Sequence, residues 1–298
     1  MELQPASYDI WDQKHRLKSI DGEIIDKTPE DTIKRVANAL ANNAEEAADF
    51  QWAITNGALP GGRIVANAGA EEHKPATSLI NCTVSGNIHD SIEGIFHAVA
   101  EGANTLKTGA GIGYCFTSLR PKGGEVRGAG ASTSGVMSFM NVFDTMCTTI
   151  ASAGGRRGAQ LGSMHIFHPD IEAFITAKQQ AGILRQFNLS VMVTDEFMRA
   201  VDQDRDWELY FPTMHVDSNT VYRTWPFEDP EYTKDYFGGT ACKIYKVVKA
   251  RDLWDLIMRS TYDYAEPGIM FSDRINYENN LWFREYISAT NPCKLCTL

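Results

Sequence analysis

Short apolar runs alternate with apolar residues at helical spacing along most of the chain beyond residue 62. Four short apolar runs predict strands: 112–116, 164–167, 189–193 and 268–271. Apolar residues three and four positions apart predict helices that open near Asp170, at Thr194 and near Leu253. Strands that alternate with helices favour an α/β architecture with parallel strand pairing. The pattern alone fits a barrel and an open sheet equally well.

The first 58 residues show a mainly helical pattern. Thr28 followed by Pro29 and two acidic residues predicts a helix start, because threonine caps a helix and proline fits its first turn. Glycine and proline at 59–62 mark a boundary. We therefore expect a helical region over 1–58 and an α/β domain over 59–298. Within the second domain, the polar and aromatic stretch 212–240 has no clean period and predicts a long surface excursion.

Composition excludes several classes of protein. The 298 residues are 43% hydrophobic and 22% charged, which is ordinary for a globular protein, and the net charge of −10 argues against a nucleic-acid-coating protein. No apolar run approaches the ~18 residues of a membrane span, and the polar N-terminus is not a secretory signal. Six cysteines spread from Cys82 to Cys296 fit a reducing cytoplasm. Cys293 and Cys296 lack a second pair, so no metal site is predicted.

Glycine-rich segments are the clearest candidates for ligand binding. Glycines at 109, 111 and 113 lie between a helical pattern and a strand, an order opposite to that of dinucleotide-binding loops. Two further segments, 120–130 and 153–160, combine arginine with glycine, which suits charge-assisted contacts to phosphate. For each of them the alternative is a mobile surface loop. Cys82, taken alone, is typical of a small buried core residue.

Asn291, Pro292 and Cys293 together resemble the segment that carries the radical-forming cysteine of ribonucleotide reductases. The resemblance to the large chains of that family continues in family order through further segments: 7–12, 119–123, 138–144, 154–160, 168–172, 187–190, 194–198 and 289–293. The chain is most similar to the adenosylcobalamin-dependent branch. The resemblance implies a helical N-terminal region followed by the first half of a ten-stranded α/β barrel.

The resemblance also implies the chemistry and the residues that perform it. In this family a thiyl radical, matched by Cys293, takes the 3′-hydrogen of a ribonucleotide, and two cysteines then supply the electrons that replace the 2′-hydroxyl by hydrogen. Cys82 matches one of those two cysteines, and Asn291 matches a residue that hydrogen-bonds the sugar. Other positions match contacts to the substrate: Asn81, Ala110 and Gly111.

Two further sets of residues match the machinery that couples a bound effector to substrate choice. Asp90, Lys107 and Arg120 match effector-binding positions, with Asp90 aligned through a one-residue insertion after Cys82. The loop between effector and substrate is matched by Gly155, Arg156, Arg157, Gly158, Ala159 and Gln160. The implied partners are a ribonucleotide substrate, a deoxynucleotide or ATP effector, and a thiol reductant such as thioredoxin. The C-terminal half of the enzyme and, in a homodimer, a second copy of the chain complete the expected partners.

The residues after Cys293 depart from the family pattern. Leu295 stands where the family has a glutamate, and leucine cannot exchange protons with a ribose hydroxyl. The second reducing cysteine is expected about a dozen residues beyond Cys293. We expect an intron or intein at the active-site codon, with a split gene or a truncated sequence as alternatives, and a ribonucleoside-diphosphate reductase that is active only when joined to the missing half. Whether diphosphates or triphosphates are reduced stays open. The alternatives are a non-catalytic effector-binding fragment and an iron-dependent reductase large subunit.

Overall fold

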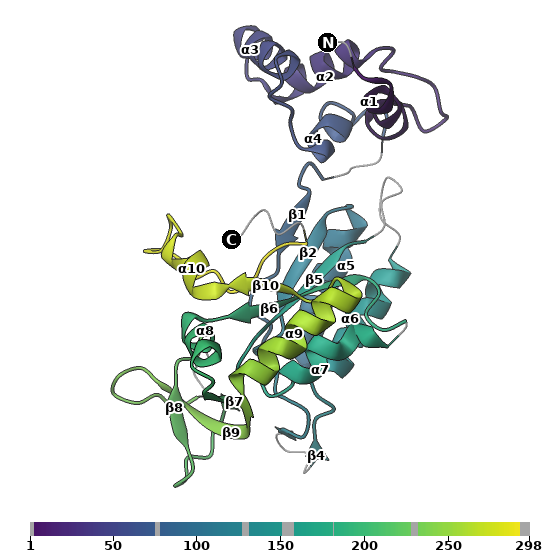
Figure 1. The fold of residues 1–298 in the computed structure, drawn as a ribbon. Helices are drawn as coiled ribbons and strands as arrows, with labels where there is room; N and C mark the ends of the chain where they lie inside the picture. The colour runs from purple at the N-terminus through teal and green to yellow at the C-terminus, as the bar shows by residue number, and fades with distance from the viewer. Residues whose placement is uncertain are drawn as a thin grey trace. The chain divides into compact units, whose positions relative to one another are not determined.

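The computed structural model describes residues 3–74, 78–126, 131–150, 158–180, 182–227 and 232–292 (Figure 1). By packing, the chain divides into two units. The first comprises Met1–Asn81, Lys107–Ala110 and Ser152–Arg157, and the second comprises Cys82–Leu106, Gly111–Ala151 and Gly158–Leu298. The boundary expected at residues 58 and 59 stays a prediction.

The first unit is helical, as its sequence predicts. Its elements are α1 (Pro5–Ile10), η1 (Trp11–His15), α2 (Pro29–Leu40), α3 (Ala44–Thr55) and α4 (Gly62–Asn67). Thr28 caps α2 as expected, accepting a hydrogen bond from the backbone N–H of Asp31 while the Asp31 side chain accepts one from the Thr28 backbone. Val36, Ile54 and Ala68 form a small apolar core between these helices.

The second unit contains a parallel sheet of five strands in the order β1-β2-β5-β6-β10 (Figure 1). These strands are β1 (Cys82–Val84), β2 (Gly111–Cys115), β5 (Gln160–His165), β6 (Phe187–Val193) and β10 (Gly268–Phe271). The predicted strands and their parallel pairing are therefore confirmed, with shifts of up to four residues at their ends. β1 and β10 form the two edges of this sheet, and the ten-stranded barrel stays a prediction.

Four helices cover one face of the sheet: α5 (Ile92–Lys107), α6 (Val136–Thr149), α7 (Ile171–Thr176) and α9 (Ala250–Tyr264). Their apolar side chains join those of the strands in one large core, in which Tyr114, Phe143 and Phe187 are fully buried. The remaining short elements are η3 (Ala177–Gln179), α8 (Asp195–Asp202) and α10 (Ser272–Tyr277). Thr194 caps α8 as predicted, accepting a hydrogen bond from the Phe197 N–H.

The stretch 212–240 crosses a three-stranded antiparallel sheet formed by β7 (Asp206–Pro212), β9 (Thr240–Lys249) and β8 (Val221–Arg223). Of the described residues in the stretch, only Pro212, Val221–Arg223 and Thr240 lie in these strands, and its description as a surface excursion stays a prediction. Tyr210 of β7 stacks on Phe167 with ring centroids 4.7 Å apart, and Cys242 of β9 is buried beside them. These contacts pack the antiparallel sheet against the residues that follow β5.

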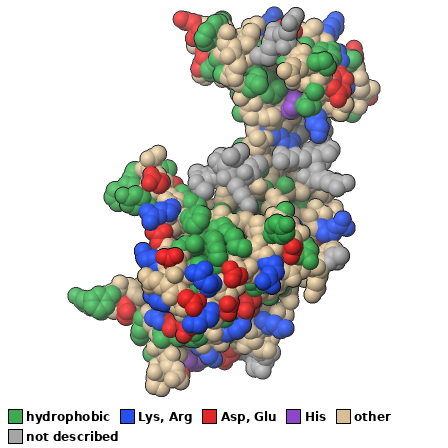
Figure 2. Space-filling view, in the orientation of Figure 1, with side chains coloured by type: hydrophobic (Ala, Val, Ile, Leu, Met, Phe, Trp, Pro, Cys, Tyr) green, Lys and Arg blue, Asp and Glu red, His purple; other side chains and the backbone are tan. Residues whose placement is uncertain are grey.

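A small hairpin follows β2. It consists of β3 (Glu125–Val126) and β4 (Ala131–Ser132), which pair antiparallel. On the face around α7 and α9 that Figure 2 shows, basic and acidic side chains are interspersed. Such a mixed surface lacks the single-sign field that would attract a nucleic-acid backbone. Among the described helices, none is long and apolar enough to cross a membrane.

Candidate functional site

Cys82 and Gly111 lie opposite each other in the parallel pairing of β1 with β2. A β-carbon placed on Gly111 would lie 3.2 Å from the Cys82 Sγ, 3.2 Å from the Pro292 Cγ and 3.2 Å from the carbonyl oxygen of Ala159. The Cys82 Sγ and the Pro292 ring are therefore separated by no more than twice that distance. The fold thus brings together Cys82, Gly111, Ala159 and the residue directly before Cys293.

The segment leading to Cys293 lies against the backbone of β2. A β-carbon on Gly113 would come within 1.8 Å of the Thr290 carbonyl oxygen and 3.1 Å of the Asn291 Cα. Only glycine permits this approach, since such short contacts do not occur between real atoms. The glycines of β2 therefore form the surface on which residues 290–292 rest.

Asn291 is the polar side chain best placed to meet a ligand here. It is only 3% exposed, and its Oδ1 atom has no hydrogen-bond partner among the described residues. A buried acceptor without a donor costs about 1–3 kcal/mol. A ribose hydroxyl is a donor of the kind that this oxygen lacks.

The other predicted substrate and loop positions lie as follows. Asn81 is exposed directly before β1, and Ala110 is buried directly before β2. Gly158 packs tightly, because a β-carbon there would meet the Cys147 Sγ at 2.6 Å, and Gln160 donates its Nε2 to the Phe143 carbonyl at 3.1 Å. The rest of the predicted site lies outside the described residues: Gly155, Arg156, Arg157 and Cys293.

Asp90 and Arg120, both predicted from the resemblance as effector contacts, form one compact pair. The Arg120 Nε donates to the Asp90 Oδ2 at 2.7 Å, the Arg120 backbone N–H donates to Oδ1 at 3.2 Å, and Nη2 donates to the Asp90 carbonyl at 2.9 Å. Nη1 donates to the Glu125 carbonyl at 2.7 Å. Lys107 ends α5 at the opposite end from Asp90 and is exposed, and its effector role stays a prediction.

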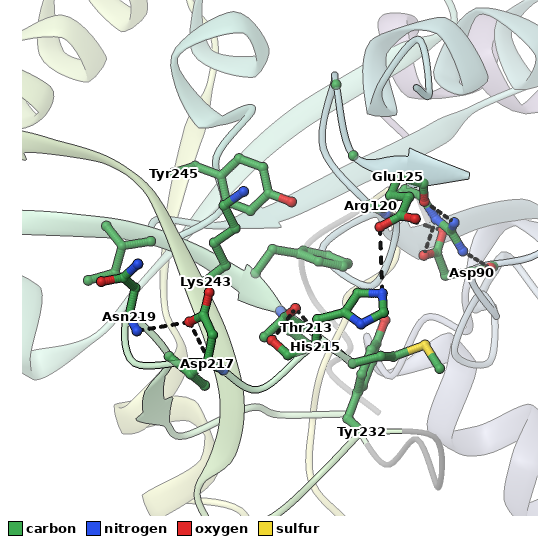
Figure 3. A pocket seen from close by; sticks show the side chains of 17 residues that line it. Asp90, Arg120, Glu125, Thr213, His215, Asp217, Asn219, Tyr232, Lys243 and Tyr245 are labelled. Atoms are coloured by element: carbon green, nitrogen blue, oxygen red, sulfur yellow. Dashed lines mark hydrogen bonds and ion pairs between the residues drawn. The ribbon is translucent and has the colours of Figure 1, made fainter. Parts of the chain in front are cut away.

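A cavity of about 810 Å³ opens beside this pair (Figure 3). Asp90, Arg120 and Glu125 line one side of it. The opposite side comes from the antiparallel sheet, including Lys243 and Tyr245 of β9. The volume is in the range of pockets that bind small molecules.

Sequence reasoning missed the β9 side of this cavity. Lys243 is exposed, and its Nζ lies 5.5 Å from the centre of the Tyr245 ring. A cation and an aromatic ring two residues apart on one strand face the same side. This spacing is the one signal in the sequence that could have indicated the pair.

Two buried histidines lie near the end of β5. The His165 Nδ1 lies 3.0 Å from the Thr117 hydroxyl, and the His168 Nε2 lies 2.9 Å from the Leu119 carbonyl oxygen. Burial lowers the pKa of His165 to about 3 and lowers the pKa of His168 as well. Both rings are therefore neutral at neutral pH.

Among the described residues, no cluster of three or more histidine, cysteine or acidic side chains could hold a metal ion. Among the described cysteines, Cys115, Cys147 and Cys242 are not joined in disulfides. Burial raises the pKa of Cys147 to about 11 and of Cys242 to about 12, so both stay protonated at neutral pH.

Comparison with known proteins gives consistent matches. Residues 80–295 match the family model described as "Ribonucleotide reductase, barrel domain". The vitamin B12-dependent ribonucleoside-diphosphate reductase of Thermoplasma acidophilum is 36% identical over 207 residues, which are 69% of this chain and 23% of that protein. The protein of the same name from Mycobacterium tuberculosis is 31% identical over 294 residues, which are 96% of this chain and 37% of that protein.

A ribonucleoside-diphosphate reductase whose name does not include vitamin B12 also matches. The ribonucleoside-diphosphate reductase subunit alpha of Helicobacter pylori is 27% identical over 281 residues, or 89% of this chain and 34% of that protein. The chain therefore spans between about a quarter and somewhat over a third of the length of these curated relatives.

Proposed function

This chain belongs to the ribonucleotide reductase family through its barrel domain, and from that premise we propose that it supplies the first part of an adenosylcobalamin-dependent ribonucleoside-diphosphate reductase. We propose that the enzyme acts in the cytoplasm. Its active site becomes complete when the remainder of the barrel joins this chain. The B12-dependent relatives match at 31–36% identity, which favours this branch over the iron-dependent one.

One observation carries the proposal. Cys82, matched to a reducing cysteine, and Pro292, next to the residue matched to the radical cysteine, both border Gly111. Asn291 lies between Thr290 and Pro292 with a buried oxygen that lacks a partner among the described residues. The reaction needs a reducing thiol and a sugar-binding amide close to the residue that precedes the radical cysteine, and this arrangement supports the proposal.

In the proposed reaction Cys293, as a thiyl radical, takes the 3′-hydrogen of the substrate and returns it at the end of the cycle. The C2′–O bond breaks and a C2′–H bond forms. Two thiols lose their hydrogens and form one disulfide; one of these hydrogens leaves with the hydroxyl as water and the other ends on C2′. Cys82 is one of these thiols, and the second comes from the part of the relatives that this chain does not span. A thioredoxin-type dithiol then reduces the disulfide.

Adenosylcobalamin, when bound, supplies the radical that activates Cys293. We propose that the contacts to this cofactor come mostly from the part of the relatives that this chain does not span. The residues of this chain act on the substrate instead. Asn291 orients the ribose, and the β2 backbone at Gly111 leaves room for it beside the Cys82 thiol.

The cavity beside Asp90 and Arg120 supports a regulatory role. We propose that it binds a deoxynucleoside triphosphate or ATP as effector. The same cavity favours the second candidate function, a nucleotide-binding fragment without catalysis, because its lining residues all lie within this chain.

The test joins this chain to a polypeptide that covers the remaining length of the relatives. The mixture is supplied with adenosylcobalamin, a ribonucleoside diphosphate and a dithiol, and deoxynucleotide is measured by chromatography. The proposal predicts cobalamin-dependent reduction without a second radical-generating subunit. Reduction that needs such a subunit supports the iron-dependent alternative, and nucleotide binding without reduction supports the effector-binding fragment.

A further inference from the structure

The turn between β5 and α7 holds both ends of the segment that carries Arg120. The Asp170 carboxylate accepts hydrogen bonds from the backbone N–H of Lys122, at 3.1 Å to each oxygen, and from the backbone N–H of Val136 at 3.0 Å. In the same turn, the His168 Nε2 lies within hydrogen-bond distance of the Leu119 carbonyl, at 2.9 Å. Leu119 and Lys122, which flank Arg120, and Val136, which follows the β3–β4 hairpin, are thus all held by this turn.

The packing around Gly135 shows how closely this anchor fits. A β-carbon on Gly135 would lie 2.8 Å from the Asp170 Oδ2 and 2.8 Å from the Lys122 backbone nitrogen. The φ angle of Gly135 is +89°, a conformation that residues with a side chain rarely adopt. Both the space and the backbone angle therefore require glycine where the segment meets the carboxylate.

Electrostatics favour a carboxylate in this position. Val136 is the first residue of α6, which is 14 residues long, so the Asp170 charge lies at the positive end of that helix. Hydrogen bonds from backbone N–H groups to a charged acceptor are stronger than those between neutral groups. An asparagine retains one acceptor oxygen, and a serine is too short to span the same distance.

Arg120 lies between the two anchored positions Leu119 and Lys122. Its side chain and backbone N–H donate hydrogen bonds to Asp90 and to the Glu125 carbonyl, at the edge of the 810 Å³ cavity. A shift of the anchored segment would move these groups together. The geometry of one wall of the cavity therefore depends on the Asp170 anchor.

We propose that Asp170 is a positioning residue that holds the Arg120 segment in the arrangement that binds the effector. The identity of the ligand rests on the proposed function, whereas the anchor itself rests on the hydrogen bonds of Asp170. Asp170 does not line the cavity, so it acts through the backbone of Lys122 and Val136 rather than through contact with the ligand.

The first test measures the anchor directly. Amide hydrogen exchange at Lys122 and Val136 is followed by NMR in this chain and in its Asp170→Asn and Asp170→Ser variants. We expect protection at the two amides to fall by about tenfold or more in Asp170→Ser and by less in Asp170→Asn. The matched control is Thr194→Ala, which removes a side-chain cap from α8 and should leave both amides unchanged. Unchanged protection in both Asp170 variants would overturn the inference.

The second test measures the consequence for ligand binding. The dissociation constant of dATP, dTTP and dGTP is measured by calorimetry for the same proteins. We expect the effector that binds most tightly to bind about fivefold or more weakly to Asp170→Ser, and equally well to Thr194→Ala even where that variant loses similar thermal stability. If the unaltered chain binds none of the three, the proposed effector binding is wrong. The hydrogen-exchange data alone then decide whether Asp170 holds the segment in place. If it binds one and the folded Asp170 variants bind equally, the positioning role is wrong.

Discussion

Cys82 lies opposite Gly111 in the β1–β2 ladder, and a β-carbon on Gly111 would meet the Cys82 Sγ at 3.2 Å. The same β-carbon would meet Pro292 at the same distance. The space above Gly111 is thus bounded by a thiol on one side and by the segment that leads to Cys293 on the other.

Replacing either glycine of β2 should therefore damage the site. Gly111→Ala forces neighbours to move by a few tenths of an ångström and should abolish reduction by the joined protein, at a stability cost of about 1 kcal/mol. Gly113→Ala, with a contact of 1.8 Å to the Thr290 oxygen, should cost about 3 kcal/mol or more. Gly86→Ala is the control, because a β-carbon there meets nothing within 4 Å. Urea unfolding and the reductase assay measure both effects, and full activity in Gly111→Ala would contradict the account.

Asn291 should show a trade-off between stability and function. Asn291→Leu replaces a buried acceptor that lacks a partner with an apolar side chain of similar volume, so the free energy of unfolding should stay equal or rise by about 1 kcal/mol. Reduction by the joined protein should be lost, since the sugar loses its hydrogen-bond partner. A fall of more than about 1 kcal/mol in unfolding free energy would mean that Asn291 Oδ1 has a protein partner and is not reserved for the substrate.

Lys243 should contribute to effector affinity from the β9 side of the cavity. Removing its charge in Lys243→Met should weaken binding of an anionic deoxynucleotide by about 1–2 kcal/mol, a factor of about 5–30, and should reduce the salt dependence of binding. The control is Lys246→Met on the same strand, where the lysine pairs with Glu172 and does not line the cavity. Calorimetry at two salt concentrations separates the variants. Equal losses in both would show that the general charge of β9, and not Lys243, governs binding.

The buried histidines should make stability depend on pH. Their folded pKa values lie below the unfolded value, so the unfolded chain binds more protons between about pH 4 and 6.5 and stability falls on acidification through that window. Each histidine that stays neutral contributes a loss of about 1.4 kcal/mol per pH unit there. Urea unfolding between pH 7 and 5 measures the slope for the unaltered chain and for His165→Gln. An identical slope in the variant would show that His165 does not stay neutral in the fold.

Local signals in the sequence predicted the helices and the parallel strands well. Thr28 and Thr194 each mark a helix start that the structure confirms, because capping acts within a few residues. A helix also starts after Asp170 as predicted, although the Asp170 side chain does not cap it. Short apolar runs predicted the parallel strands for a similar reason. A strand that is buried on both faces is apolar whichever strands it pairs with, so its own sequence is enough to indicate it.

Contacts between residues far apart in the chain could not be predicted from the local sequence pattern. The antiparallel sheet was missed because β9 alternates only in part and its pairing joins Asp206 to Lys249, far apart in the chain. The resemblance indicated Cys82, Asn291, Asp90 and Arg120. Asp90 and Arg120 are in direct contact, and Cys82 and Pro292, the residue after Asn291, both border Gly111. The role of Asp170 left no signal, because its partners are backbone amides, which every residue but proline carries.

The most direct test maps the cysteines after one turnover. The joined protein is given adenosylcobalamin and a ribonucleoside diphosphate without an external dithiol, and its disulfides are mapped by mass spectrometry. The account predicts that Cys82 forms a disulfide in an amount equal to the deoxynucleotide produced, while Cys115, Cys147 and Cys242 remain thiols. Deoxynucleotide formation with Cys82 still a thiol, or no reduction by the folded and fully supplied protein, would contradict it.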